Sequence, residues 1–266
     1  MTEADVVART PFPRTRESLA KELRALGLGP GDTVLVHASL SALGWVAGGA
    51  VAVIWALVDV LTSEGTLVMP AFTGEYSEPS QWRNPPVPAA WWPVIRGAMP
   101  AFDPFRTPTR GVGQVAETFR TWPGVLRSCH PAVSFAAWGK QALLVTRDHP
   151  RSFPLGEGSP LGILYRLDSR VLLLGVDYSR NSCFHLAESR VFQSTVACGA
   201  PVMSQGRREW VVYEDVAGDA RSFSAIGEAF EAGGQVVTGR VGSATARLFS
   251  LAKAVDFAAG FLTRRC

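Results

Sequence analysis

The sequence predicts an α/β fold with a mixed, largely parallel central sheet, flanking helices and a C-terminal hairpin and α/β extension. A strand, helix and strand are predicted in succession over residues 33–69, which is typical of a parallel βαβ unit. The run Val171–Val176 is rich in branched and leucine side chains without alternation, as in a strand covered on both faces. No domain boundary is visible, so residues 1–266 are expected to form a single domain, with residues 1–14 as a flexible N-terminal tail.

Periodicity and turn residues place the elements along the chain. Helices are predicted over residues 15–26, 50–61, 113–120, 140–146, 161–166, 225–232 and 244–262, and strands over 33–36 and 66–69. Residues 195–203 and 209–214 flank a Gln205-Gly206 turn and predict the hairpin. A further helix is expected to begin at Asn181 and Ser182, which are both favourable N-cap residues.

Composition limits the classes of partner. With 47% hydrophobic and 18% charged residues the chain is globular, and a net charge of +3 without any block of like charges argues against nucleic acid. The longest apolar run, residues 50–61, is too short for a bilayer and contains Asp59. The N-terminus lacks a signal-peptide pattern. We therefore expect a cytoplasmic protein that binds no membrane, and the composition leaves its oligomeric state open between monomer and homodimer.

The cysteines and histidines do not indicate a metal site. Four of each are scattered without C-x-x-C or H-E-x-x-H spacing, so neither a disulfide framework nor zinc is expected. Cys183 at a predicted helix start is one candidate nucleophile, because a thiol there can have a lowered pKa. Its neighbour His185 points to another face of the helix, which disfavours cysteine chemistry.

His185 and Glu188 are the main catalytic candidates. Three residues apart on the predicted helix, they share one face, directly after a buried strand whose carboxyl end is where sites form in α/β sheets. An imidazole in the first turn of a helix tends to stay neutral and can accept a proton, while the carboxylate orients the ring. The alternative interpretation is a structural histidine beside a solvated glutamate.

A glycine-rich turn is the candidate anion site. The strand over 33–36 runs through HASLSALGWVAGG into a helix, so backbone N–H groups and the hydroxyls of Ser39 and Ser41 could meet a phosphate. The glycines could equally serve backbone geometry. A second phosphate-like pattern, Arg24-x-x-Gly27-x-Gly29, ends a helix instead of opening one, and we interpret it as a C-cap and turn.

Residues 73–108 differ from the rest of the chain. They contain eight of the 18 prolines and lack sustained periodicity. Long ordered loops are often functional, and this one is expected to form a wall of the substrate site, with Glu75 and Asp103 available for a cationic ligand. A surface excursion with solvated acids is the alternative.

An ordered set of motifs resembles the aminoglycoside 3-N-acetyltransferase family. It comprises VLVHASLSALG, LVMPAFTGEYSEPSQW, R-S-x-H-P, G-x-G-S-P and VLLLGVDYSRNSCFHLAE, within a match from about residue 15 to the C-terminus. The resemblance implies acetyl-CoA as donor, the 3-amino group of a 2-deoxystreptamine aminoglycoside as acceptor, antibiotic resistance as the outcome, no metal, and a fold distinct from the common small acetyltransferases. The same fold acting on another amine, and a non-catalytic coenzyme A binding protein, are the alternatives.

The resemblance also implies roles for individual residues. His185 and Glu188 match the catalytic H-x-x-E, and Asn181 matches the asparagine before it. Matches to coenzyme-binding positions are Ser39 and Ser41 in V-H-x-S-x-S and the pair Arg127 and Ser128. Ala38 and Cys183 depart from the usual pattern.

The implied chemistry is consistent with these residue types. An aliphatic amine must lose a proton before it attacks a thioester, and His185 can accept that proton. The oxyanion needs hydrogen-bond donors, for which backbone amides or Asn181 are candidates. A polycationic acceptor needs local carboxylates, and Glu75, Asp103 and Glu157 are the expected ones.

Overall fold

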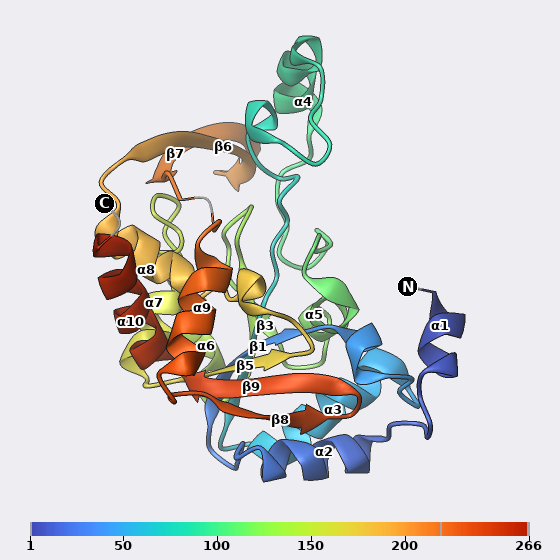
Figure 1. Ribbon diagram of the computed structural model, residues 1–266. Helices are drawn as coiled ribbons and strands as arrows, with labels where there is room; N and C mark the ends of the chain where they lie inside the picture. Colours follow the sequence, from blue (N-terminus) through green and yellow to red (C-terminus); the bar gives the residue numbers. More distant parts are fainter. Residues whose placement is uncertain (1, 219, 265–266) are drawn as a thin grey trace.

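A seven-stranded mixed sheet forms the centre of the computed structural model, which describes residues 2–218 and 220–264 (Figure 1). The strand order is β3-β4-β2-β1-β5-β9-β8. Their bounds are Leu126–Arg127, Phe135–Gly139, Thr66–Pro70, Thr33–Ala38, Arg170–Leu174, Ala244–Ser250 and Val237–Val241, in that order. β1 pairs in parallel with β2 and β5, and the outer pairings are antiparallel. Only β4 and β9 run in the direction opposite to β1, and the other strands of this sheet run parallel to it. The predicted mixed and largely parallel sheet is therefore confirmed.

The three parallel strands are buried on both faces, as their unbroken apolar sequences predict. In β1, Val34 and Val36 enter one core while Leu35 enters the other, and β5 alternates in the same way. The first core is covered by α2 (Arg16–Ala25), α3 (Gly49–Leu61) and α5 (Gly113–Arg120). The second is covered by α6 (Ala142–Thr146), α7 (Pro160–Arg166), α8 (Phe184–Val191), α9 (Phe223–Ala232) and α10 (Leu251–Thr263).

The prediction of a helix over residues 244–262 is wrong for residues 244–250, which form a strand. Residues 244–250 form β9, which pairs with β5 and with β8, and α10 begins only at Leu251. Alternate residues Ala244, Ala246 and Leu248 are buried, so the segment has the period of a strand within an apolar stretch. Ser250 caps α10 by accepting a hydrogen bond from the Lys253 amide at 3.3 Å. The other predicted helices and the hairpin, β6 (Thr195–Ser204) with β7 (Arg207–Val216), are confirmed. The predicted start of one of them is wrong, because α8 begins at Phe184 with Cys183 as its N-cap, so neither Asn181 nor Ser182 caps it.

The segment expected as an N-terminal tail contains a helix. Residue 1 lies outside the described residues, and α1 (Glu3–Ala8) follows a capping box between Thr2 and Asp5. The Thr10 hydroxyl accepts a hydrogen bond from the Trp45 amide at 2.8 Å, which attaches this segment to the loop before α3.

Residues 73–108 form an arm that stands away from the sheet beside the β6–β7 hairpin (Figure 1). The arm contains η2 (Pro79–Gln81), η3 (Ala89–Trp91) and α4 (Trp92–Ala98). It is attached to the hairpin through Gln81, whose Nε2 donates to the Ala197 carbonyl at 2.9 Å, and through Arg208, whose Nε donates to the Met99 carbonyl at 2.9 Å.

Two stacked histidines fill the space between the R-S-x-H-P loop and the hairpin. The rings of His130 and His149 lie 5.0 Å apart, and Ser128 Oγ is 2.8 Å from His149 Nδ1. His130 Nδ1 accepts hydrogen bonds from two backbone amides, those of residues 132 and 133. Burial lowers the pKa of His130 to about 3 and that of His149 to about 4, and burial also lowers the pKa of His37 in β1 to about 3.

These buried histidines predict acid destabilisation. Their folded-state pKa values lie below the unfolded value of about 6.5, so as the pH falls the unfolded chain binds protons first. The free energy of unfolding is therefore expected to be complete above about pH 6.5 and to decrease below it, by up to about 1.4 kcal/mol per pH unit for each histidine. Urea midpoints at pH 7.5, 6 and 5 measure it, and His149→Asn should give a shallower slope. Equal midpoints at pH 7.5 and 5 would contradict the prediction.

Candidate functional site

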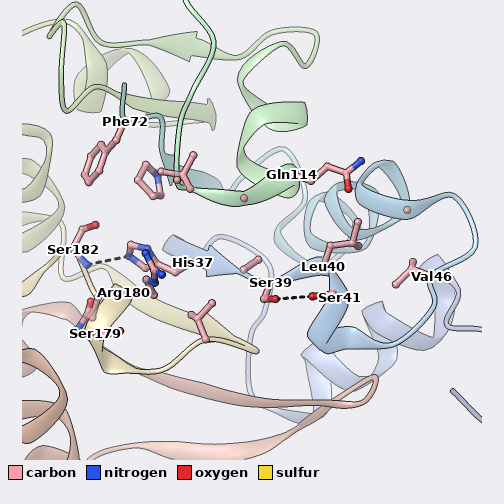
Figure 2. Close-up of a pocket in the computed structure, with 18 of the residues that line it drawn as sticks. His37, Ser39, Leu40, Ser41, Val46, Phe72, Gln114, Ser179, Arg180 and Ser182 are labelled. Atoms are coloured by element: carbon pink, nitrogen blue, oxygen red, sulfur yellow. Dashed lines mark hydrogen bonds between the residues drawn. The ribbon is translucent and has the colours of Figure 1, made fainter. Parts of the chain in front are cut away.

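A cavity of about 770 Å³ opens at the carboxyl ends of β1, β2 and β5 (Figure 2). This is the edge at which parallel sheets place their sites. Its wall combines residues that follow the three strands with the starts of α3, α5 and α8. α1 contributes Thr2, Glu3 and Val6, so the N-terminal segment is also part of the wall.

His185 and Glu188 form a hydrogen-bonded pair at this cavity. His185 lies in the first turn of α8, as predicted, and its Nδ1 is 2.7 Å from Glu188 Oε2. The glutamate is only 4% exposed, whereas the His185 side chain is 28% exposed and lines the cavity. A neutral ring that donates its Nδ1 proton to the carboxylate keeps the Nε2 lone pair free to accept a proton.

The segment that follows β7 packs against Glu188 and donates a hydrogen bond to its carboxylate. The Ala220 amide donates to Glu188 Oε1 at 3.3 Å. Gly218 lies so close that a Cβ atom there would be 2.5 Å from Glu188 Oε2. Only a residue without a side chain leaves room for the carboxylate, and no local motif in the sequence connected this glycine with α8.

Asn181 brings an unpaired donor to the cavity. Its side chain is fully buried, and Oδ1 accepts a hydrogen bond from the Cys183 amide at 3.3 Å. Its Nδ2 has no hydrogen-bond partner among the described residues. A buried unsatisfied donor costs about 1–3 kcal/mol, so this amide group is available to donate to an acceptor atom in the cavity.

Cys183 is not suited to act as a nucleophile. Its side chain is fully buried, and burial raises the pKa of the thiol to about 12. A thiol with that pKa stays protonated near neutral pH, and the thiolate is the reactive form. The structure therefore argues against Cys183 as the candidate nucleophile.

The opposite part of the cavity is suited to an anion. Ser39 and Ser41, at the end of β1, both line it, with their hydroxyls 3.4 Å apart (Figure 2). Gly49 and Gly113, the first residues of α3 and α5, also line it. Helix N-termini present free backbone N–H groups and a positive dipole end. Arg180, a lining residue that the sequence analysis did not single out, adds a full positive charge.

His37 supports the start of α8 from β1. The Ser182 amide donates to His37 Nε2 at 3.4 Å, so the ring joins the strand to the residues just before the helix (Figure 2). Desolvation, followed by the nearby charge of His185, lowers the pKa of His37, which keeps it neutral and able to accept this hydrogen bond.

Arg127 and Ser128, expected on the coenzyme side, do not line this cavity. The Arg127 guanidinium donates to the carbonyls of Thr107 and Ala71 at 2.6 and 2.8 Å, and burial lowers its pKa to about 10. The Ser128 hydroxyl contacts His149 and accepts from the Phe135 amide. Both side chains tie the arm and the loop after β3 to the sheet.

The three carboxylates expected to bind a cation do not line this cavity either. Each is already paired with an arginine: Glu75 with Arg110, Asp103 with Arg106 and Glu157 with Arg190. Asp103 Oδ1 also accepts from the amides of residues 105 and 106, so it closes a turn as Asp before Pro often does.

The described residues contain neither a metal-binding cluster nor a membrane-spanning helix. No group of three or more His, Cys, Asp or Glu side chains in residues 2–218 and 220–264 is placed to hold a metal ion. Over the same residues, no helix is long and apolar enough to cross a membrane.

Comparisons with known proteins give consistent matches. Residues 35–263 match the model of a family described as aminoglycoside 3-N-acetyltransferase. The aminoglycoside N(3')-acetyltransferase-like protein YokD of Bacillus subtilis is 53% identical over 95% of this chain and 94% of its own. Its crystal structure superimposes with a TM-score of 0.96 over 98% of this chain and 97% of that one.

Two other relatives are also similar over nearly their full length. Aminoglycoside N(3)-acetyltransferase VIII of Streptomyces fradiae is 37% identical and covers 100% of this chain and 97% of its own. A structure described as AAC-IIIb in a binary complex with CoASH is 33% identical, with a TM-score of 0.85 over 96% of this chain and 98% of that one.

Proposed function

The chain belongs to the aminoglycoside 3-N-acetyltransferase family, and from that premise we propose that it transfers the acetyl group of acetyl-CoA to the 3-amino group of a 2-deoxystreptamine aminoglycoside. Modification of this kind would confer antibiotic resistance. The observation that carries the proposal is the His185–Glu188 pair at 2.7 Å, located where a cavity with anion-binding groups reaches the start of α8.

We assign the cavity to acetyl-CoA, which supplies the activated acetyl group as a thioester. Ser39, Ser41, the α3 and α5 N-termini and Arg180 suit the phosphates of the coenzyme. Among the residues that the structure describes, Glu3 is the one carboxylate that lines the cavity, which suits a polyanion better than a polycationic aminoglycoside. The related AAC-IIIb was solved with CoASH, which supports the same assignment.

His185 acts as the general base in this proposal. The acceptor amine is mostly protonated at neutral pH and becomes a nucleophile when His185 Nε2 takes its proton. Glu188 accepts the hydrogen bond from Nδ1, fixes the tautomer and stabilises the imidazolium that forms. Because the carboxylate is buried, its interaction with the charged ring is little screened by water.

Asn181 is proposed to stabilise the charge that develops on the thioester oxygen. Its free Nδ2 group lines the same cavity as His185, and its Oδ1 is fixed by the Cys183 amide. A donor that is already oriented and desolvated needs no reorganisation when the negative charge appears.

Thiol release from acetyl-CoA with a panel of aminoglycosides tests the function, with NMR of the product to locate the acetyl group. We expect His185→Ala to fold and bind acetyl-CoA but to lose about 10²-fold or more in turnover, since a positioned base contributes about 10²–10⁴-fold. Glu188→Gln should lose less because the base survives. Cys183→Ala is the matched control and should keep its turnover. Wild-type turnover in His185→Ala would remove the base assignment.

Gly218→Ala tests how Glu188 is held. The added Cβ would lie 2.5 Å from Glu188 Oε2 and must displace the carboxylate, so kcat should fall about tenfold with little change in the KM for acetyl-CoA. Gly97→Ala is the control, because a Cβ at Gly97 meets nothing within 4 Å. If kcat were unchanged in Gly218→Ala and the crystal structure of this variant kept the His185–Glu188 hydrogen bond, the close approach of Gly218 to Glu188 would not be needed for activity.

Arg180→Gln tests the orientation of the coenzyme. Loss of a charge that meets phosphate should raise the KM for acetyl-CoA about tenfold and leave the KM for the aminoglycoside nearly unchanged. Arg240→Gln removes an equal charge from an exposed position in β8 and should alter neither constant. If Arg180→Gln instead affected only the aminoglycoside KM, the cavity would belong to the acceptor.

A further inference from the structure

Asp215 is a carboxylate near the catalytic pair that the sequence analysis overlooked. It lies near the end of β7, opposite Val196 of β6, and is half-buried. Tyr213, two residues earlier, shares its face of the strand and is packed against the His130 ring at 5.4 Å. The face of the hairpin that carries Asp215 is therefore turned toward the body of the protein.

The residues that follow Asp215 in the chain pass close to the Glu188 side chain. Gly218, three residues later, lies against the Glu188 carboxylate, and three residues span at most about 10 Å. The influences on the pKa of Asp215 agree with a position near the pair. Burial raises this pKa, and the hydrogen bond from the Val216 amide lowers it. The charge of His185 also lowers it, whereas the charge of Glu188 raises it. Asp215 is thus within electrostatic range of both members of the pair.

Asp215 forms no salt bridge with an arginine or a lysine among the residues described. Its Oδ1 accepts a hydrogen bond from the Val216 amide at 2.8 Å, and no arginine or lysine in the described chain forms a salt bridge with it. Glu75, Asp103, Glu157 and also Glu78, by contrast, are all neutralised by arginines. A half-buried carboxylate without a counter-ion is unfavourable unless a ligand supplies the positive charge.

We propose that Asp215 binds a protonated amino group of the acceptor, adjacent to the amine that His185 deprotonates. The proposal rests on the function proposed above and specifies its acceptor as a molecule with at least two amino groups. His185 lines the coenzyme cavity, whereas Asp215 does not. Donor and acceptor therefore approach the imidazole from different sides, with the coenzyme from the end of β1 and the acceptor from beneath the β6–β7 hairpin.

The test compares Asp215→Asn with wild type in steady-state kinetics with each substrate varied, beside melting curves. Asparagine keeps the size of the side chain and the oxygen that accepts from the Val216 amide. We expect the aminoglycoside KM to rise about tenfold or more, with the acetyl-CoA KM within about twofold of wild type. The Tm should stay equal or rise, because the variant removes a poorly solvated charge that lacks a partner. Glu214→Gln is the matched control and should not change the aminoglycoside KM, because it removes an equal charge from an exposed position on the other face of β7.

The outcomes separate this proposal from the proposed function. Acetylation by wild type with equal aminoglycoside KM values for wild type and Asp215→Asn would overturn the role of Asp215 and leave the function standing. A lower Tm with both KM values raised alike would assign Asp215 to structure and also overturn it. If wild type acetylated no aminoglycoside, titration calorimetry of the aminoglycoside against wild type and Asp215→Asn would still decide whether Asp215 binds a polyamine, and equal Kd values would reject it.

Discussion

The hydrogen bond between His185 Nδ1 and the buried Glu188 carboxylate is the interaction on which the rest of the site depends. In a neutral ring that donates from Nδ1 to the carboxylate, Nε2 keeps a free lone pair, and the burial of Glu188 keeps water away from the hydrogen bond. Several distant parts of the chain serve that requirement. β5 and α8 place the pair, β1 supports the start of α8 through His37, and Gly218 and Ala220 cover the carboxylate.

The parallel centre of the sheet explains why one cavity collects so many polar groups. β1, β2 and β5 all end at the same edge, so the serines after β1, the loop after β2 and the asparagine before α8 converge there. The starts of α3 and α5 face the same edge and add partial positive charge. The two apolar cores on either side of the sheet hold these groups on a rigid support.

The acidic side chains of the arm form salt bridges with arginines, whereas Asp215 does not, and this difference separates acids that stabilise the fold from one that is suited to bind a ligand. The carboxylates of the arm over residues 73–108 form salt bridges with arginines. The arm itself is hydrogen-bonded to the hairpin. Asp215 lies on the inner face of that hairpin, and no arginine or lysine among the described residues pairs with it. The hairpin therefore contacts the arm, and Asp215 shares a strand face with Tyr213, which packs against His130.

The sequence by itself determined the local features of this protein. Apolar runs identified the parallel strands, the i,i+3 spacing put His185 and Glu188 on one helical face, and the serines after β1 reached the cavity as expected. Only the tertiary structure decided which charges are free and which distant residues meet. Arg127, Glu75 and Asp103 have the residue types that ligand binding needs, but protein groups satisfy them. Gly218 lies against Glu188 of α8 although thirty residues separate them in the chain, and Asp215 lies within electrostatic range of the same helix. Residue type and spacing specify what a side chain can do within one element, whereas burial and the presence of a partner depend on chain segments that only folding brings together.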